Sequence, residues 1–262
     1  MKEWSNIVME RNENNYTINS KEDFEGFSNL TNEQYDLCFN FAREMADGEL
    51  HREFRTGGEK NRNKNEVFIN TLQGKLSEVF VQNVLYQNGI TSINIDTGVY
   101  SRGEWDAVDL IVNTPMNNTK KITIKSTKNF GNLMLLEKND WNESAKYKHN
   151  GINNEYDYFI LVRVKCELES KLKAKRMFYS EVLEKEELKK IYYDQINKNN
   201  IQFDIPGFLY KSNIQKVILN RQLIEKGKTL NGKTVMDADN YYVQAGNMYN
   251  INELFNELKY SY

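Results

Sequence analysis

An apolar stripe with helical spacing constrains the fold of this chain most. From about 67 to 87 the apolar residues recur at the period of an α-helix, at Ile69, Leu72, Leu76, Phe80 and Val84. The Asn88-Gly89 pair predicts the end of this helix, because glycine adopts the left-handed conformation of a C-terminal cap at little cost. The stripe therefore predicts one long helix that packs by a single apolar face.

After this helix the sequence changes to strand-like segments. Predicted strands are VDLIV at 108–112, KITIK at 121–125 and EYDYFILVRVK at 155–165. Further helices are predicted at 31–50, with Thr31 as N-cap, at 180–199 and at 250–260, and short strands and turns from 203 up to that last helix. This order predicts an α/β (α+β) fold with a central mixed β-sheet flanked by helices. With 262 residues and two prolines, we expect one domain, 1–262.

Composition limits the class of protein. Hydrophobic residues make up 39% and charged residues 27% of the chain, as in a soluble globular protein. No run approaches the roughly 20 apolar residues of a membrane helix, and the first residues lack a signal-peptide pattern, so we expect a cytoplasmic protein without a membrane partner. Cys38 and Cys166 form no ligand or disulfide pattern. The formal net charge of −2 does not exclude a nucleic-acid partner, because a basic groove can lie on an acidic protein.

Two consecutive strands bring an acid and a lysine to one edge of the predicted sheet. Asp109 lies at the start of the first strand. On the second strand Thr123 and Lys125 share a face, because side chains two residues apart point the same way. A carboxylate beside a lysine is commonly a surface salt bridge, worth about 0–1 kcal/mol. The same pair can also hold Mg²⁺ through carboxylate oxygens and orient a water molecule with the amine.

The order of these motifs resembles the PD-(D/E)xK nuclease superfamily, most closely its type II restriction endonucleases. In that family a helix with a glutamate precedes a strand with an aspartate, and a second strand carries an acid-x-lysine pair. Here GKLSEVF supplies Glu78, EWDAVDLIV supplies Asp109 and ITIKST supplies Lys125, before the long strand YDYFILVRV. The resemblance covers about 65–165 as a restriction-endonuclease-like catalytic core, and implies DNA-recognition and dimerisation elements at 1–64 and 166–262.

One position departs from the family pattern. The family has Glu, Asp or Gln two residues before the lysine, whereas this chain has Thr123, whose neutral hydroxyl is a poor Mg²⁺ ligand. Some restriction enzymes with this pattern carry serine there and take the second acid from a later position. The resemblance therefore implies Asp109 as a metal ligand, with Glu137 or Glu78 as the second acid. Asp106 is a further candidate beside Asp109, or only a residue that caps the strand.

The resemblance implies Mg²⁺-dependent hydrolysis of phosphodiester bonds in double-stranded DNA at a short specific sequence. Its implied catalytic residues are Asp109, Lys125, Glu78 and Thr123, with Lys125 positioning the attacking water. Cutting both strands requires two active sites, so we expect a homodimer, and a companion DNA methyltransferase belongs to such a system. The alternatives are a nuclease of the same core in repair or defence, and a non-catalytic DNA-binding module with a decayed site.

DNA contacts are predicted from the basic segments of the chain. Lysine and arginine neutralise phosphates, and an asparagine side chain can pair with adenine. The candidates are Arg52, Arg55, Lys128, Lys146, Lys148 and Asn240. Each of them can instead be a solvated residue of a loop or turn.

Overall fold

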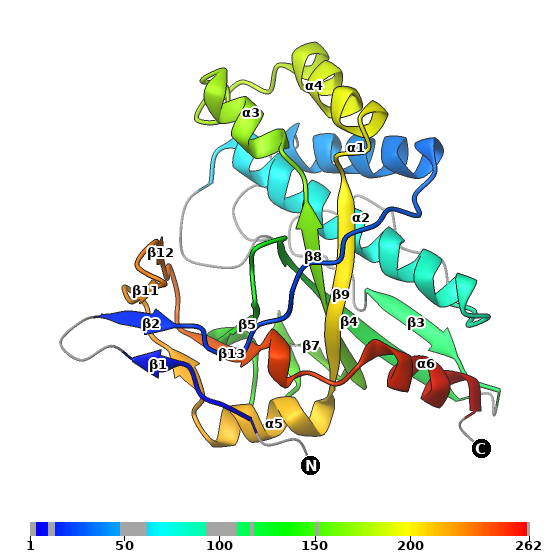
Figure 1. Cartoon of the computed structure of the whole chain (residues 1–262), viewed down its shortest axis with the longest axis vertical. Coiled ribbons are helices and arrows are strands. Elements are labelled where there is room, and N and C mark those ends of the chain that lie inside the picture. Colours follow the sequence, from blue (N-terminus) through cyan, green and yellow to red (C-terminus); the bar gives the residue numbers. More distant parts are fainter. Residues whose placement is uncertain are drawn as a thin grey trace.

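The structure is a computed structural model that describes residues 4–9, 14–47, 62–92, 109–115, 118–149 and 152–260. These residues form a mixed α/β fold in which helices pack against sheets with parallel and antiparallel strands (Figure 1). The predicted class, a mixed sheet with flanking helices, is confirmed.

The central sheet has four strands in the order β3-β4-β8-β9. Its strands are β3 (Leu110–Asn113), β4 (Thr119–Lys128), β8 (Tyr158–Lys165) and β9 (Gln202–Tyr210). β4 pairs antiparallel with β3 and parallel with β8, and β8 pairs antiparallel with β9. Parallel neighbours require a long crossover connection, and β5, β6 and β7 lie in the crossover between β4 and β8.

Helices pack on one face of this sheet. α1 (Asn32–Asp47) and α2 (Lys64–Gln87) share a hydrophobic core with Ile122 and Ile124 of β4. α3 (Leu168–Ala174) and α4 (Lys185–Asn197) lie near α1 in Figure 1, and α6 (Ile251–Tyr260) closes the same core. All five residues of the predicted stripe on α2 are buried. Burial is not confined to that face, because Phe68, Ser77, Val81 and Leu85 on other faces of the helix are buried too.

A second, smaller core fills the opposite face. It joins Phe159 and Leu161 of β8 to β5 (Leu133–Glu137), α5 (Lys211–Leu219) and β13 (Asn240–Gln244). β10 (Leu223–Ile224) pairs with β13, and β13 pairs with β5. The remaining short strands are β1 (Val8–Met9), β2 (Asn15–Thr17), β6 (Tyr147–His149), β7 (Ile152–Asn154), β11 (Thr229–Leu230) and β12 (Thr234–Val235).

Some predicted boundaries differ from the structure. α2 begins three residues earlier than expected, because Asn63 and Glu66 form a capping box. The β6–β7 hairpin, α3 and α5 were not predicted, since their apolar runs are short. The predicted helix at 180–199 shortens to α4, while the helix at 250–260 and the Thr31 cap, whose hydroxyl accepts the Gln34 N–H, are confirmed.

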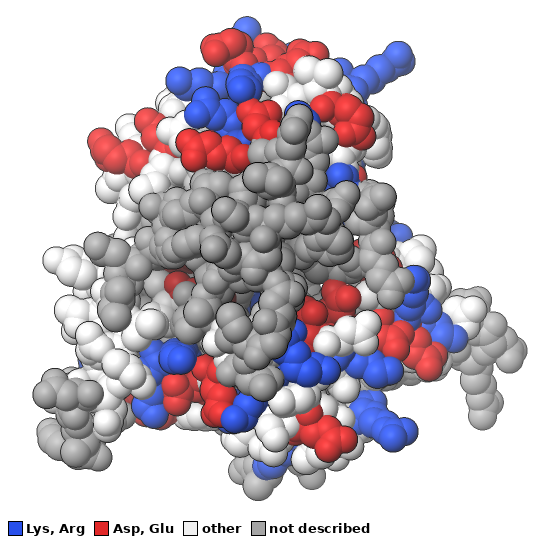
Figure 2. All heavy atoms as spheres, turned by 180° about the vertical axis from the view of Figure 1, so that it is seen from behind, with Lys and Arg blue, Asp and Glu red and all other residues white. Residues whose placement is uncertain are grey.

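Charges of both signs mix on the surface. On the described part of the face in Figure 2, lysine and arginine side chains lie among aspartate and glutamate side chains. No helix of the described chain combines the length and the apolar character needed to cross a membrane.

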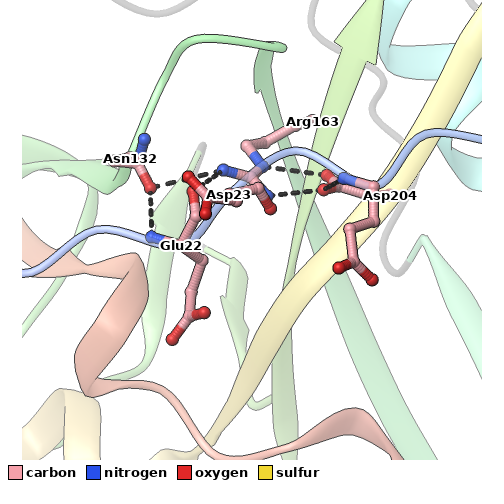
Figure 3. Close-up of polar contacts among 6 residues, drawn as sticks. Glu22, Asp23, Asn132, Arg163 and Asp204 are labelled. Atoms are coloured by element: carbon pink, nitrogen blue, oxygen red, sulfur yellow. Dashed lines mark hydrogen bonds and ion pairs between the residues drawn. The ribbon is translucent and has the colours of Figure 1, made fainter.

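A buried arginine joins the sheet to the N-terminal segment (Figure 3). Arg163 of β8 is 1% exposed, and its Nε donates to Asp204 Oδ1 of β9 at 2.9 Å. Its two other nitrogens donate to the carbonyl oxygens of Glu22 and Asp23. The Asn132 side chain accepts from both Arg163 and the Glu22 N–H. A guanidinium with these partners is satisfied although it is excluded from water.

We expect Asp204→Asn to lower the free energy of unfolding by about 3–5 kcal/mol, because it leaves the Arg163 charge buried without its counter-charge. The matched control is Asp237→Asn, which removes the aspartate from the Arg62–Asp237 pair at the surface. That loss should stay within about 1 kcal/mol. Urea denaturation measures both, and equal losses would contradict the role assigned to the buried pair.

Candidate active site

The side chain of Asp109 continues the hydrogen bonding of the central sheet where β3 stops. β3 pairs with β4 only as far as Ile122, the Cα partner of Leu110. The next donor on that edge of β4, the Ile124 N–H, is taken by Asp109 Oδ2 at 2.6 Å. The Thr123 hydroxyl donates to the same oxygen at 2.9 Å. Two donors on one oxygen fix the orientation of this carboxylate.

A cavity of about 510 Å³ lies along this edge of β4. Asp109, Thr123 and Lys125 line it from the sheet. Glu78 lines it from α2, and Tyr147 and Tyr156 line it from the opposite side of β4, where they adjoin the smaller core. The residues of the implied catalytic set therefore share one cavity, although Glu78 lies on α2 and Lys125 on β4.

A buried lysine holds the glutamate of α2. The Lys75 Nζ donates to Glu78 Oε2 at 2.6 Å and lies 4.5 Å from the centroid of the Phe41 ring. Lys75 is 3% exposed, so its charge needs this carboxylate and the ring. The spacing of three residues on one helix face brings the two groups together.

More acidic groups lie close to the cavity. Burial, and then the charge of Glu137, raises the pKa of Asp140 to about 6, while Lys125 and Lys148 act in the opposite direction. Burial, followed by the negative charges of Asp140, Asp109 and Glu137, also raises the pKa of Tyr147. The cavity is thus a place where carboxylates and lysine amines act on one another at short range.

The donors in the cavity suit a hard divalent cation. Mg²⁺ is commonly held by one or two carboxylates together with water and substrate phosphate, and Asp109 and Glu78 provide two carboxylates. Among the described residues, no group of three or more His, Cys, Asp or Glu side chains forms a metal cage. Asp109 and Glu78 are the carboxylates of the described cavity lining that could hold a cation.

Several predicted residues lie elsewhere. Glu137 is at the end of β5, outside the lining of the cavity. Asn240 is buried in β13, where its amide donates to the Ala238 carbonyl oxygen, so this side chain does not point to solvent as a base-reading residue would. Lys128 and Lys146 form ion pairs with Glu169 and Glu155. The predicted residues Arg52, Arg55 and Asp106 are outside the described residues.

Asp140 and Lys75 were missed from the sequence. The segment KNDW after β5 contains no motif that singles out Asp140. Its raised pKa comes from burial and from charges, including that of Lys125, that only the folded chain brings near it. The signal for Lys75 was present in GKLSE, since a lysine and a glutamate three apart share a helix face.

Gly74 is a third residue of the cavity region that was not predicted from the sequence. It lines the cavity from the middle of α2, where glycine costs helix stability.

Gly74→Ala should raise the free energy of unfolding by about 0.5–1 kcal/mol, since alanine is the better helix former and an added Cβ meets no described atom within 4 Å. The same methyl group narrows the cavity, so we expect weaker binding of a ligand there. Thermal unfolding gives the first effect. A fall in stability would show that the glycine is required for packing instead.

The titration of Asp140 is a direct test of the electrostatics. Its pKa rises from 3.8 to about 6 in the folded chain. Between these two pH values the Asp140 carboxyl is protonated in the folded state and ionised in the unfolded state. The contribution of neutral Asp140 to stability is therefore complete below pH of about 4 and is lost as the pH rises through about 6. Carboxyl ¹³C NMR should show this midpoint, and Asp140→Asn should remove that part of the pH dependence of stability. A midpoint near 4 would contradict the assignment.

Comparison with known proteins gives no match to a protein-family model, to a curated protein or to a solved structure.

Proposed function

We propose that this protein is a Mg²⁺-dependent endodeoxyribonuclease of the type II restriction class, which hydrolyses phosphodiester bonds of double-stranded DNA. The observation that carries the proposal is the shared cavity of Glu78, Asp109, Thr123 and Lys125. The elements that carry these residues also follow the order of the PD-(D/E)xK core. α2 carries the glutamate, β3 begins directly after the aspartate, and β4 carries the lysine.

Asp109 is the proposed anchor of the cation. The Thr123 hydroxyl and the Ile124 N–H hold its Oδ2. Thr123, which stands where the family has an acid, thus orients a carboxylate instead of supplying one. A bound Mg²⁺ would neutralise charge on the phosphate oxygens.

Lys125 has the charge and the position to act on the attacking water and the phosphate. Lys125 lines the same cavity, and its side chain is on the same face of β4 as that of Thr123. An ammonium group beside a phosphate can orient the attacking water and stabilise the charge that develops on the phosphate oxygens. We assign Lys125 this role.

Glu78 is the better candidate for the second acid. It lines the cavity and is held by Lys75, whereas Glu137 lies outside the lining. Asp140 is near Lys125, and its raised pKa lets it hold or release a proton close to neutral pH. A homodimer and a companion methyltransferase remain part of the proposal, because a restriction enzyme cuts both strands and spares its own DNA.

Lys125→Ala should reduce cleavage of phage DNA at least a hundredfold and leave DNA binding nearly unchanged, because the amine acts mainly on the reacting phosphate. Gel assays in Mg²⁺ measure cleavage, and a mobility shift in EDTA measures binding. Lys121→Ala is the matched control: it removes a lysine from the same strand and face, outside the cavity. Cleavage by Lys125→Ala at the native rate would rule out the assigned role.

The wild-type assay also separates the functional classes. Discrete bands that require Mg²⁺ support a restriction enzyme, and a metal-dependent smear indicates a less specific nuclease. A mobility shift without cleavage would show a DNA-binding module with a decayed site, and would overturn the proposal.

A further inference from the structure

A second cavity lies at the other end of the molecule from α3 and α4. It encloses about 490 Å³ between the N-terminal residues, α5 and the turn that follows α5. Figure 1 shows the first described residues beside α5, far from α3 and α4. The lining residues of this cavity and those of the candidate active site do not overlap. Its volume is within the range of small-molecule sites, about 300–1,000 Å³.

The lining combines aromatic rings with cations. Trp4, Tyr242 and Tyr249 supply the rings, and Lys216 and Arg221 supply the positive charge. No described carboxylate lines this cavity, although the chain carries 37 acidic and 35 basic residues. Asn220 and other amide side chains add hydrogen-bonding groups at the wall. Rings, amides and cations at one wall suit an anion that also has a flat polar ring.

Arg221 is held in an uncommon conformation at the wall of the cavity. It follows the C-cap of α5 with φ of 51°, in the left-handed region that glycine or asparagine usually fills at a helix end. Its backbone N–H bonds to the Ile218 carbonyl oxygen, but no described residue forms a hydrogen bond or an ion pair with its guanidinium. Arg176 after α3 has a similar φ of 59°, so the backbone conformation alone assigns no role. Arg221 is distinguished by its place in the wall of the cavity.

We propose that this cavity binds a nucleotide. The base would stack on the partly exposed rings of Trp4 and Tyr249 and bond to the exposed amide of Asn220, as bases do on single-strand-binding surfaces. Tyr242 is buried beside them, and its hydroxyl accepts the Ile7 N–H. Arg221 would hold the phosphate through its planar fork of donors. The same chemistry serves a free nucleotide or one nucleotide of an unpaired strand. This site is independent of the proposed cleavage reaction.

Calorimetric titration of the full chain in EDTA tests the site, because cleavage cannot occur without a divalent metal. The probes are the four deoxynucleoside 5′-monophosphates, the matching nucleosides, inorganic phosphate and a single-stranded trinucleotide. We expect at least one monophosphate to bind at least tenfold more tightly than its nucleoside or phosphate. If the trinucleotide binds more tightly than the best monophosphate, the ligand is one nucleotide of an unpaired strand. If the two bind equally, the ligand is a free nucleotide.

Arg221→Gly should weaken this binding at least tenfold without lowering the melting temperature, since glycine suits the positive φ. Arg176→Gly is the matched control, because Arg176 is an exposed arginine with φ of 59° just after α3. It should leave binding unchanged. Arg221→Asn gives a second test, since asparagine also tolerates this conformation. No binding of any nucleotide, or equal effects of the two glycine variants, would overturn the proposal.

Discussion

The contact of Arg163 with Asp204 is the constraint on which much of the architecture depends. β8 runs through the centre of the molecule with seven of its eight residues buried, and a charged residue there requires a complete set of partners. Arg163 finds them in β9, in the turn before β5 and in the N-terminal segment. One side chain thus fixes how the first residues of the chain cross the sheet, as Figure 3 shows.

The candidate active site depends on a difference in strand length. β3 is short and β4 is long, so part of the β4 edge is left for side chains instead of a neighbouring described strand. Asp109 fills the first position of that edge, and the cavity follows. The same edge carries Lys125, which is why a carboxylate and an amine from separate strands share one space.

The sequence predicted the elements with strong periodicity and the site residues that lie on them. α2 and β8 were found because their apolar patterns are long. Glu78, Asp109 and Lys125 were singled out by the resemblance of their order to a nuclease core, and all three line one cavity. α3 and α5 were missed, because short apolar segments look alike whether they form helices or strands. Asp140 could not be predicted, since its raised pKa comes from burial and from neighbours that only the folded chain brings near. Asn240 was predicted to contact a DNA base or to lie in a turn, and the pairing of β13 buries it instead.

The central claim is that Asp109 and Lys125 serve one divalent ion at the edge of β4. A crystal structure of the chain grown with millimolar Mn²⁺, with anomalous scattering data, locates that ion directly. The account predicts an anomalous peak in contact with the Asp109 carboxylate, with the Lys125 amine on the same side of the sheet. A peak only elsewhere in the molecule, or the two side chains on opposite sides of the sheet, would contradict it.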